Sequence, residues 1–239
     1  MRAVFFSLVF FIFPTCICRF LCLLFGGKNY SVGKNCHIGF SLIKAGKVIL
    51  ADNTNIGHFN VIKTNEIYID GKIKHLNIIS GRFVFKMENR AWMLNQNKIT
   101  GSNIDGKVIN SFVMRRESSI IVHHIFDVTD NITIGEKTCV AGYGSQIWTH
   151  SFIFGKQNKA AQVSKSVEIG KNCYIGSSCV ICPGVSIADN TVIGSHTTVS
   201  KSLKVSGLYV GQGIRYIPYD PDVAIRTIEE NGSGYIFNR

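Results

Sequence analysis

Residues 163–204 read VSKSVEIGKNCYIGSSCVICPGVSIADNTVIGSHTTVSKSLK and repeat every six positions. The first position of each hexad is a β-branched aliphatic residue: Val163, Ile169, Ile175, Ile181, Ile187, Ile193 and Val199. An amphipathic helix places apolar residues every three or four positions and a half-buried strand every two, so neither element explains the period. Short strands joined by turns explain it when three strands form one coil and each coil buries the face of its neighbour. The sequence therefore predicts a triangular parallel β-helix. Its predicted stacks are Ile169 on Ile187, Ile175 on Ile193 and Ile181 on Val199.

Weaker hexads continue the pattern upstream. They include Val128, Ile134 and Val140, and near the N-terminus Val32, Ile38, Leu50, Ile56 and Ile62. Residues 63–127 are rich in strand-forming residues but show no clean period of six. We interpret residues 28–127 as partly irregular coils of the same stack and residues 128–212 as its regular part. The alternative is a separate small β domain inserted at 63–127.

Two segments interrupt the repeat. Residues 146–162 separate two good blocks, which predicts a loop extruded from a coil, and long loops in compact folds are often functional. After residue 205 the repeat decays into a tail, residues 213–239. There Asp220 is suited to cap a helix, Pro221 to start it and Gly232 to end it. We expect this short C-terminal helix to close one end of the stack.

The N-terminal segment, residues 1–27, is apolar. It carries no charge from Ala3 to Cys18 and resumes as Phe20–Phe25 after Arg19. A membrane-spanning helix needs roughly 20 apolar residues, and Pro14 would kink this one. A secretory signal is the alternative, but no A-x-A-like cleavage site follows. We expect an apolar helix that associates with a membrane surface through residues 3–25.

Charge and cysteine content restrict the partners. The net charge of +11 favours an anionic partner, although charge alone does not choose among nucleic acid, lipid and a phosphate-bearing cofactor. The eight cysteines form no compact disulfide framework, which fits a reducing compartment. Cys179 and Cys182 form a CxxC, but no second pair stands at zinc-site spacing, so we predict no metal.

The sequence IGKNCYIGSSCVICPGVSIADNTVIGSHTTVSKSL at 169–203 resembles the hexapeptide-repeat acyltransferases. GYGSQIWTH at 142–150, followed by GLYVGQGIRYI at 207–217, resembles the branch that O-acetylates bacterial surface polysaccharides. The resemblance implies an all-β fold, a left-handed parallel β-helix. It also implies a homotrimer, with acetyl-CoA as co-substrate held in the groove between adjacent prisms.

In such enzymes a loop histidine is the general base, and His150 stands in the matching place. A sugar hydroxyl attacks a thioester slowly until a base takes its proton, and histidine suits that task at neutral pH. Direct transfer needs no protein nucleophile. We expect the acceptor sugar to contact Tyr143, Gln146 and Trp148.

The resemblance also implies cofactor-binding positions in the last coils. Matched motif by motif, these are Ser177, Ser195, Ser200, Lys201 and Arg215. Lys201 and Arg215 suit phosphate groups. The sequence departs from the family pattern at Gly213 and Ile214, where family members usually carry Pro and a small residue.

The predicted function is an acetyl-CoA-dependent O-acetyltransferase acting on a sugar of a bacterial surface polysaccharide or its precursor. We place it in the cytoplasm, peripheral to or anchored at the inner face of the plasma membrane, with no nucleic-acid partner. One alternative is a nucleotide-sugar N-acetyltransferase on the same scaffold. Another is a non-catalytic β-helix scaffold anchored to the membrane.

Overall fold

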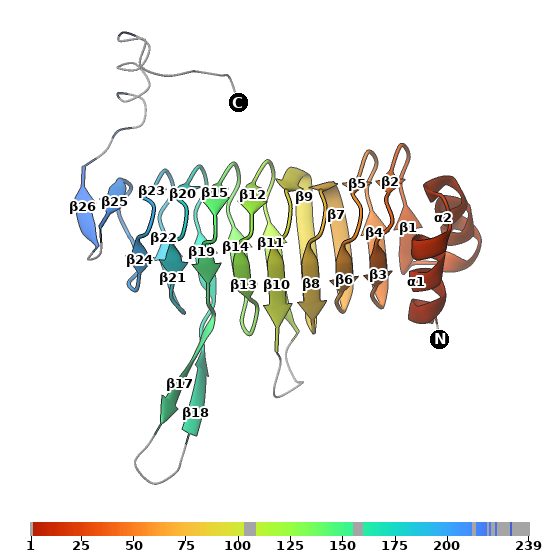
Figure 1. Cartoon of the computed structure of the whole chain (residues 1–239), viewed down its shortest axis with the longest axis horizontal. Helices are drawn as coiled ribbons and strands as arrows, with labels where there is room; N and C mark the ends of the chain where they lie inside the picture. The colour runs from red at the N-terminus through yellow and green to blue at the C-terminus, as the bar shows by residue number, and fades with distance from the viewer. Residues whose placement is uncertain are drawn as a thin grey trace.

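The computed structural model describes residues 2–102, 109–154, 160–211 and 214–218, together with Asp220, Val223 and Glu230. Over these residues the chain is a parallel β-solenoid with helices packed on its N-terminal end (Figure 1). The arrangement fits the left-handed β-helix that the resemblance implies. The predicted fold class is therefore confirmed.

Three flat faces make up the prism. Face 1 contains β1 (Tyr30–Val32), β4 (Lys47–Leu50), the first half of β7 (Glu66–Ile73), the first half of β9 (Phe83–Met93), β11 (Asn110–Met114), β14 (Ile132–Ile134), β19 (Val167–Ile169) and β22 (Ser186–Ile187). Face 2 contains β2 (His37–Ile38), β5 (Asn55–Ile56), the second halves of β7 and β9, β12 (Ser119–Val122), β15 (Cys139–Tyr143), β20 (Tyr174–Ile175), β23 (Val192–Ile193) and β25 (Leu208–Val210). The last strand, β26 (Arg215–Ile217), pairs antiparallel with β25.

Face 3 is a separate sheet of eight strands in the described part of the chain. Its members are β3 (Leu42–Lys44), β6 (Val61–Lys63), β8 (Ile78–Gly81), β10 (Lys98–Gly101), β13 (Ile125–Asp127), β16 (Gln146–Ile147), β21 (Val180–Ile181) and β24 (Thr198–Val199). Faces 1 and 2 join into one sheet because β7 and β9 run around the corner between them, β7 with a register shift between Ile69 and Gly71.

The repeat positions form the core, as predicted. Ile169 pairs with Ile187, Ile175 with Ile193 and Ile181 with Val199. These six side chains are at most 2% exposed. Val163 is the exception: it lies in the hairpin strand β18 and pairs with Ser151 rather than stacking in a coil. Val163 fits the spacing of six, but it precedes β19, the strand with which the chain re-enters the prism.

The described residues between 63 and 127 lie in the same stack. β7 pairs with β4 and β5 on one side and with β9 on the other, and β9 continues the ladder to β11 and β12. The period of six is lost because these strands bend around a corner without a turn, and because the coils differ in length. Ile79 pairs with Ile99, and Ile99 pairs with Phe126.

The N-terminal segment contains α1 (Arg2–Ile12), α2 (Thr15–Leu21) and the π-helical turn η1 (Cys22–Gly26). The break falls at Pro14, which lacks the backbone N–H that a continuous helix needs. Phe6 stacks on Tyr30 of the first coil, with ring centroids 4.0 Å apart, so the helices cover the apolar end of the prism. Of the C-terminal capping helix that we predicted, nearly all lies outside the described residues, although Asp220 accepts a hydrogen bond from the Val223 backbone N–H at 3.3 Å.

Candidate active site

His150 lies where the chain leaves the prism. It follows β16 on face 3 and is the first residue of β17 (His150–Phe154), which pairs antiparallel with β18 (Ala160–Ser164). This hairpin projects away from the coils (Figure 1). The predicted extruded segment, 146–162, is wrong at both limits. Gln146 and Ile147 remain in the coil because they pair with β13 and β21, and the projecting part runs from His150 to Ser164.

Asp127 holds the imidazole of His150. The Nδ1 of His150 lies 2.6 Å from the Oδ2 of Asp127, the last residue of β13. The Asp127 side chain is 9% exposed and that of His150 21% exposed. A carboxylate accepts hydrogen bonds only, so Nδ1 carries the proton, and Nε2 is left as the nitrogen that can take one. The pair thus has the geometry of a general base and its orienting acid.

Neighbouring groups hold the carboxylate of Asp127. The hydroxyl of Thr129 donates to Oδ1 at 2.8 Å. The backbone N–H and the hydroxyl of Thr149 donate to Oδ2 at 3.2 and 3.0 Å. These contacts fix the direction of the carboxylate. A negative carboxylate in turn stabilises the imidazolium that forms when Nε2 takes a proton.

Asp127 was not among the residues predicted from the sequence. Its position follows from ladder register, since Phe126 pairs with Ile147, which sets Asp127 beside Trp148 in the next coil. The separation in sequence between Phe126 and Ile147 differs from that between partners in regular coils, and so does the separation between Ile99 and Phe126. Without the register, no sequence signal separates Asp127 from the other acidic residues.

The predicted acceptor contacts divide into two groups. Trp148 lies near His150, with a distance of 6.4 Å between the two ring centroids, and its indole N–H donates to the Gln146 side chain at 3.2 Å. Phe152, which was not predicted, lies 5.5 Å from His150 in an edge-on arrangement. Tyr143 lies at the other end of β16, where its ring centroid is 4.8 Å from that of His123. The structure therefore does not bring Tyr143 beside His150 within one chain.

The predicted cofactor contacts also lie at two separate places on the prism. Ser200 and Lys201 follow β24 at the corner where face 3 meets face 1, which we call the His150 edge. Lys201 lies two ladder steps from Thr149, roughly 10 Å along that edge. Ser177 and Ser195 precede β21 and β24 at the corner where face 2 meets face 3, which we call the Ser177 edge. The backbone of Arg215 lies in β26, opposite Val210.

The two edges are separated by the width of face 3. A coil side of about six residues spans roughly 20 Å at about 3.3 Å per residue. The Ser177 Oγ accepts a hydrogen bond from the Tyr143 backbone N–H at 3.3 Å, so these two residues belong to one edge and His150 to the other. The predicted contacts therefore lie on two separate edges of one prism.

Residues 166–201 match the family described as bacterial transferase hexapeptide (six repeats). The match confirms the hexapeptide repeats predicted from the sequence and covers the regular coils that follow the hairpin. No curated protein sequence matches the chain.

Solved hexapeptide proteins are similar to the chain at low identity. The N-acyltransferase AntD from Bacillus cereus, in complex with dTDP and 3-hydroxybutyryl-CoA, is 17% identical with a TM-score of 0.44, covering 88% of this chain and 94% of that one. The polysialic acid O-acetyltransferase OatWY is 17% identical with a TM-score of 0.42, covering 80% and 83%. The hexapeptide-repeat containing acetyltransferase VCA0836 from Vibrio cholerae is 18% identical with a TM-score of 0.40, covering 56% and 69%. Likeness at this level assigns no activity to this chain.

Proposed function

We propose that this hexapeptide-repeat chain is an acetyl-CoA-dependent O-acetyltransferase that transfers an acetyl group to a sugar hydroxyl of a bacterial surface polysaccharide or its precursor. The observation that carries the proposal is the 2.6 Å contact between His150 and Asp127 at the foot of the projecting hairpin. A buried carboxylate that directs a partly exposed imidazole suits proton abstraction from a weak nucleophile. Trp148 offers a flat apolar surface beside that base for a sugar ring.

The transfer is direct. The acceptor hydroxyl oxygen attacks the thioester carbonyl carbon while the Nε2 of His150 takes the hydroxyl proton. Asp127 retains its hydrogen bond to the Nδ1 proton and stabilises the resulting imidazolium. The tetrahedral intermediate then collapses, the carbon–sulfur bond breaks, and the proton on Nε2 passes to the departing CoA sulfur. The products are a sugar acetyl ester and free CoA, and His150 returns to its neutral form.

We propose that two copies of the chain complete each site, in a homotrimer. The His150 edge of one copy, with Lys201, would meet the Ser177 edge of the next, so that acetyl-CoA lies between them. The apolar side chains exposed on face 3 and on its corner with face 2 support this arrangement. They are Leu42, Val61 and Ile78 on the face, and Phe40, Phe59 and Leu76 on the corner. Six large apolar side chains in adjoining columns are an unusual surface for a monomer.

We further propose that the N-terminal helices attach the enzyme to the inner face of the plasma membrane. Many apolar side chains of this segment are exposed, among them Phe5, Leu8, Ile12, Phe20, Leu23, Leu24 and Phe25. In the described part of the chain, no helix is both long and apolar enough to cross a membrane. The proposed contact is attachment through the exposed apolar side chains of this segment.

The test uses purified protein, labelled acetyl-CoA and a panel of oligosaccharides. The His150→Ala variant, with an unchanged circular dichroism spectrum, should lose about 10²- to 10⁴-fold in kcat, because general-base help is worth that much. The product should be an ester that mild base releases, whereas an amide product would identify the N-acetyltransferase alternative. Full activity in His150→Ala would overturn the assignment of the base. Failure of the folded protein to bind CoA would favour the scaffold alternative.

A further inference from the structure

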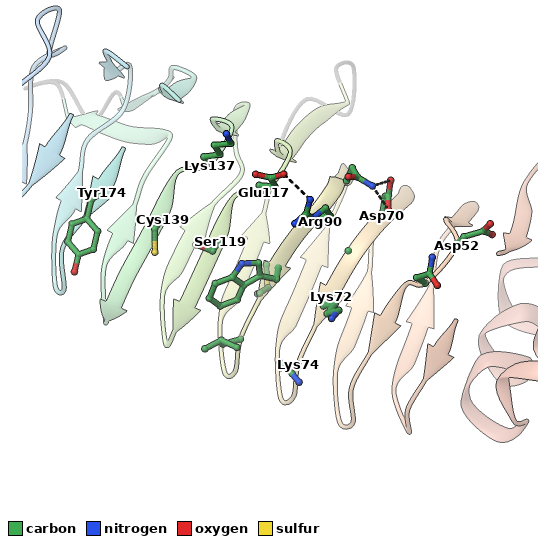
Figure 2. A pocket seen from close by; sticks show the side chains of 16 residues that line it. Asp52, Asp70, Lys72, Lys74, Arg90, Glu117, Ser119, Lys137, Cys139 and Tyr174 are labelled. Atoms are coloured by element: carbon green, nitrogen blue, oxygen red, sulfur yellow. Dashed lines mark hydrogen bonds and ion pairs between the residues drawn. The ribbon is translucent and has the colours of Figure 1, made fainter. Parts of the chain in front are cut away.

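A groove of about 850 Å³ lies on face 2, over β7, β9, β12, β15 and β20 (Figure 2). His150 is not among its lining residues, and the strand that leads to His150 belongs to face 3. The catalytic base therefore does not explain this groove.

The floor of the groove is made by small side chains between two aromatic rings. Trp92 pairs with Ser119, Ser119 with Cys139 and Cys139 with Tyr174, so the four residues follow one another along the ladder. Ser119 is 6% exposed, whereas Trp92 is 37% and Tyr174 47% exposed. Figure 2 shows Ser119, Cys139 and Tyr174 in succession on neighbouring strands. The rings thus border a hollow instead of filling it.

The two rings are far enough apart for a chain ligand. Three ladder steps of about 4.8 Å separate Trp92 from Tyr174, a distance of roughly 14 Å. One sugar ring cannot stack on both aromatic side chains, but a short oligosaccharide can. The line between the rings runs along the prism axis, since each ladder step is one coil.

Charges on the rims are distributed unevenly. Arg90 pairs with Glu117 at 3.4 Å, and Asp70 accepts from the amide of Asn89 at 3.2 Å. Lys72 pairs in register with Trp92, and among the described residues neither Lys72 nor Lys74 takes part in an ion pair. Cationic charge without a protein partner therefore lies beside the indole ring.

We propose that this groove binds an acidic glycan chain, with sugar rings on Trp92 and Tyr174 and an anionic group at Lys72 and Lys74. The carboxylates of Asp70 and Glu117 and the amide of Asn89 suit the many hydroxyl donors of a glycan. A DNA strand offers few such hydroxyl donors. The proposal rests on the proposed function and deepens it: the groove would retain a polymeric acceptor while another part of the polymer reaches His150.

The experiment measures binding without acetyl-CoA. In the Trp148→Phe protein, Trp92 is the remaining one of the two tryptophans in the chain, so its fluorescence reports on the groove. The probes are a tetrasaccharide of galacturonic acid, a tetrasaccharide of sialic acid, neutral maltotetraose and an eight-nucleotide oligothymidylate, each also titrated by calorimetry. We expect an acidic tetrasaccharide to bind, maltotetraose to bind more weakly and oligothymidylate not to bind.

Variants assign the binding to the groove. Trp92→Ala and, independently, Lys72→Glu should each weaken binding of the acidic tetrasaccharide at least about tenfold, as removal of a central contact does. Lys204→Glu changes an exposed lysine outside the groove by the same charge and should leave binding unchanged. Melting curves show whether Trp92→Ala is folded. Lys72→Glu changes an exposed side chain, so it tests binding even if Trp92→Ala does not fold.

Three results would overturn the proposal: no binding of either acidic tetrasaccharide, equal binding by the wild type and both groove variants, or a preference for oligothymidylate. The outcomes are distinct from those of the proposed function. If transfer fails while groove binding persists, the catalytic proposal falls. If transfer of acetyl to a monosaccharide persists while groove binding is absent, only this inference falls.

Discussion

At the residue scale, the decisive contact joins two positions that the sequence does not connect. The sequence offers His150 as a candidate base, because histidine has the acid–base chemistry that acetyl transfer to a hydroxyl requires and stands in the matching motif. Asp127 could not be predicted, because its neighbour across the ladder depends on the lengths of irregular coils. Tyr143 was assigned to the same cluster from its nearness in sequence. The strand β16 separates Tyr143 from His150, because each residue of an extended strand adds about 3.3 Å along the face.

Replacement of Asp127 tests whether the carboxylate orients the base. Asp127→Asn keeps the size of the side chain but removes the charge that stabilises the imidazolium, so we expect kcat to fall on the order of 10²-fold or more with little change in the KM for acetyl-CoA. Asp130→Asn is the matched control, because the Asp130 carboxylate accepts from its neighbour Asn131. Wild-type kcat in a folded Asp127→Asn protein would contradict an orienting role.

His124 is a buried residue whose protonation should affect stability. It is 0% exposed, its Nδ1 accepts the Ser145 backbone N–H at 3.0 Å, and its Nε2 has no hydrogen-bond partner among the described residues. Burial lowers the pKa of His124 from 6.5 to about 4. The unfolded chain therefore binds this proton more readily than the folded chain. The stability from neutral His124 is complete above about pH 6.5 and decreases as the pH falls toward 4.

The measurement is the free energy of unfolding between pH 7 and pH 4. His124→Asn should remove a decrease of about 3 kcal/mol from that range, the linkage value of the lowered pKa. Asparagine suits the position because Asn97, in the preceding coil, accepts the His124 backbone N–H and is itself part of an asparagine column with Asn77. His196→Asn, at an exposed histidine, should leave the pH dependence as in the wild type. If His124→Asn keeps the full decrease, other groups cause it.

At the element scale, the period of six predicts how coils stack but not where a coil ends. Ile169 and its successors repeat because identical coils demand identical side chains at the same register. Val163 fits that frame equally well and yet belongs to the hairpin, because alternation of side chains is the same in a coil strand and a hairpin strand. The bent strands β7 and β9 have no repeat signature, since each uses a long strand where a regular coil uses two short strands and a turn.

The close approach of neighbouring coils can be tested at Gly135. A Cβ atom there would clash with the backbone carbonyl of Gly170 in the next coil. We therefore expect Gly135→Ala to lower the free energy of unfolding by about 1–3 kcal/mol, the usual cost of overpacking. Gly46→Ala is the matched control, because the nearest atom to its Cβ would be the Asn65 carbonyl oxygen at 3.3 Å. Equal denaturant midpoints for the two variants would show that the coils separate without cost.

At the scale of the whole molecule, the two edges of face 3 determine what one chain can do. Trp148, His150 and Lys201 lie on one edge, and Ser177 and Ser195 lie on the other. If each site uses the His150 edge of one copy and the Ser177 edge of the next, a lesion on one edge and a lesion on the other inactivate different sites of a ring. Mixed rings should then contain some sites in which both edges are intact.

Complementation between inactive chains tests this arrangement. We expect His150→Ala and Ser195→Trp each to be inactive alone, the first without its base and the second with its cofactor groove filled. Chains denatured together in equal amounts and refolded should recover about a quarter of wild-type activity, because each site draws its two edges independently from two copies. The same chains mixed without refolding are the control for residual activity. If the refolded mixture is no more active than either variant, the sites are not shared between copies. Both edges of each site would then belong to one chain.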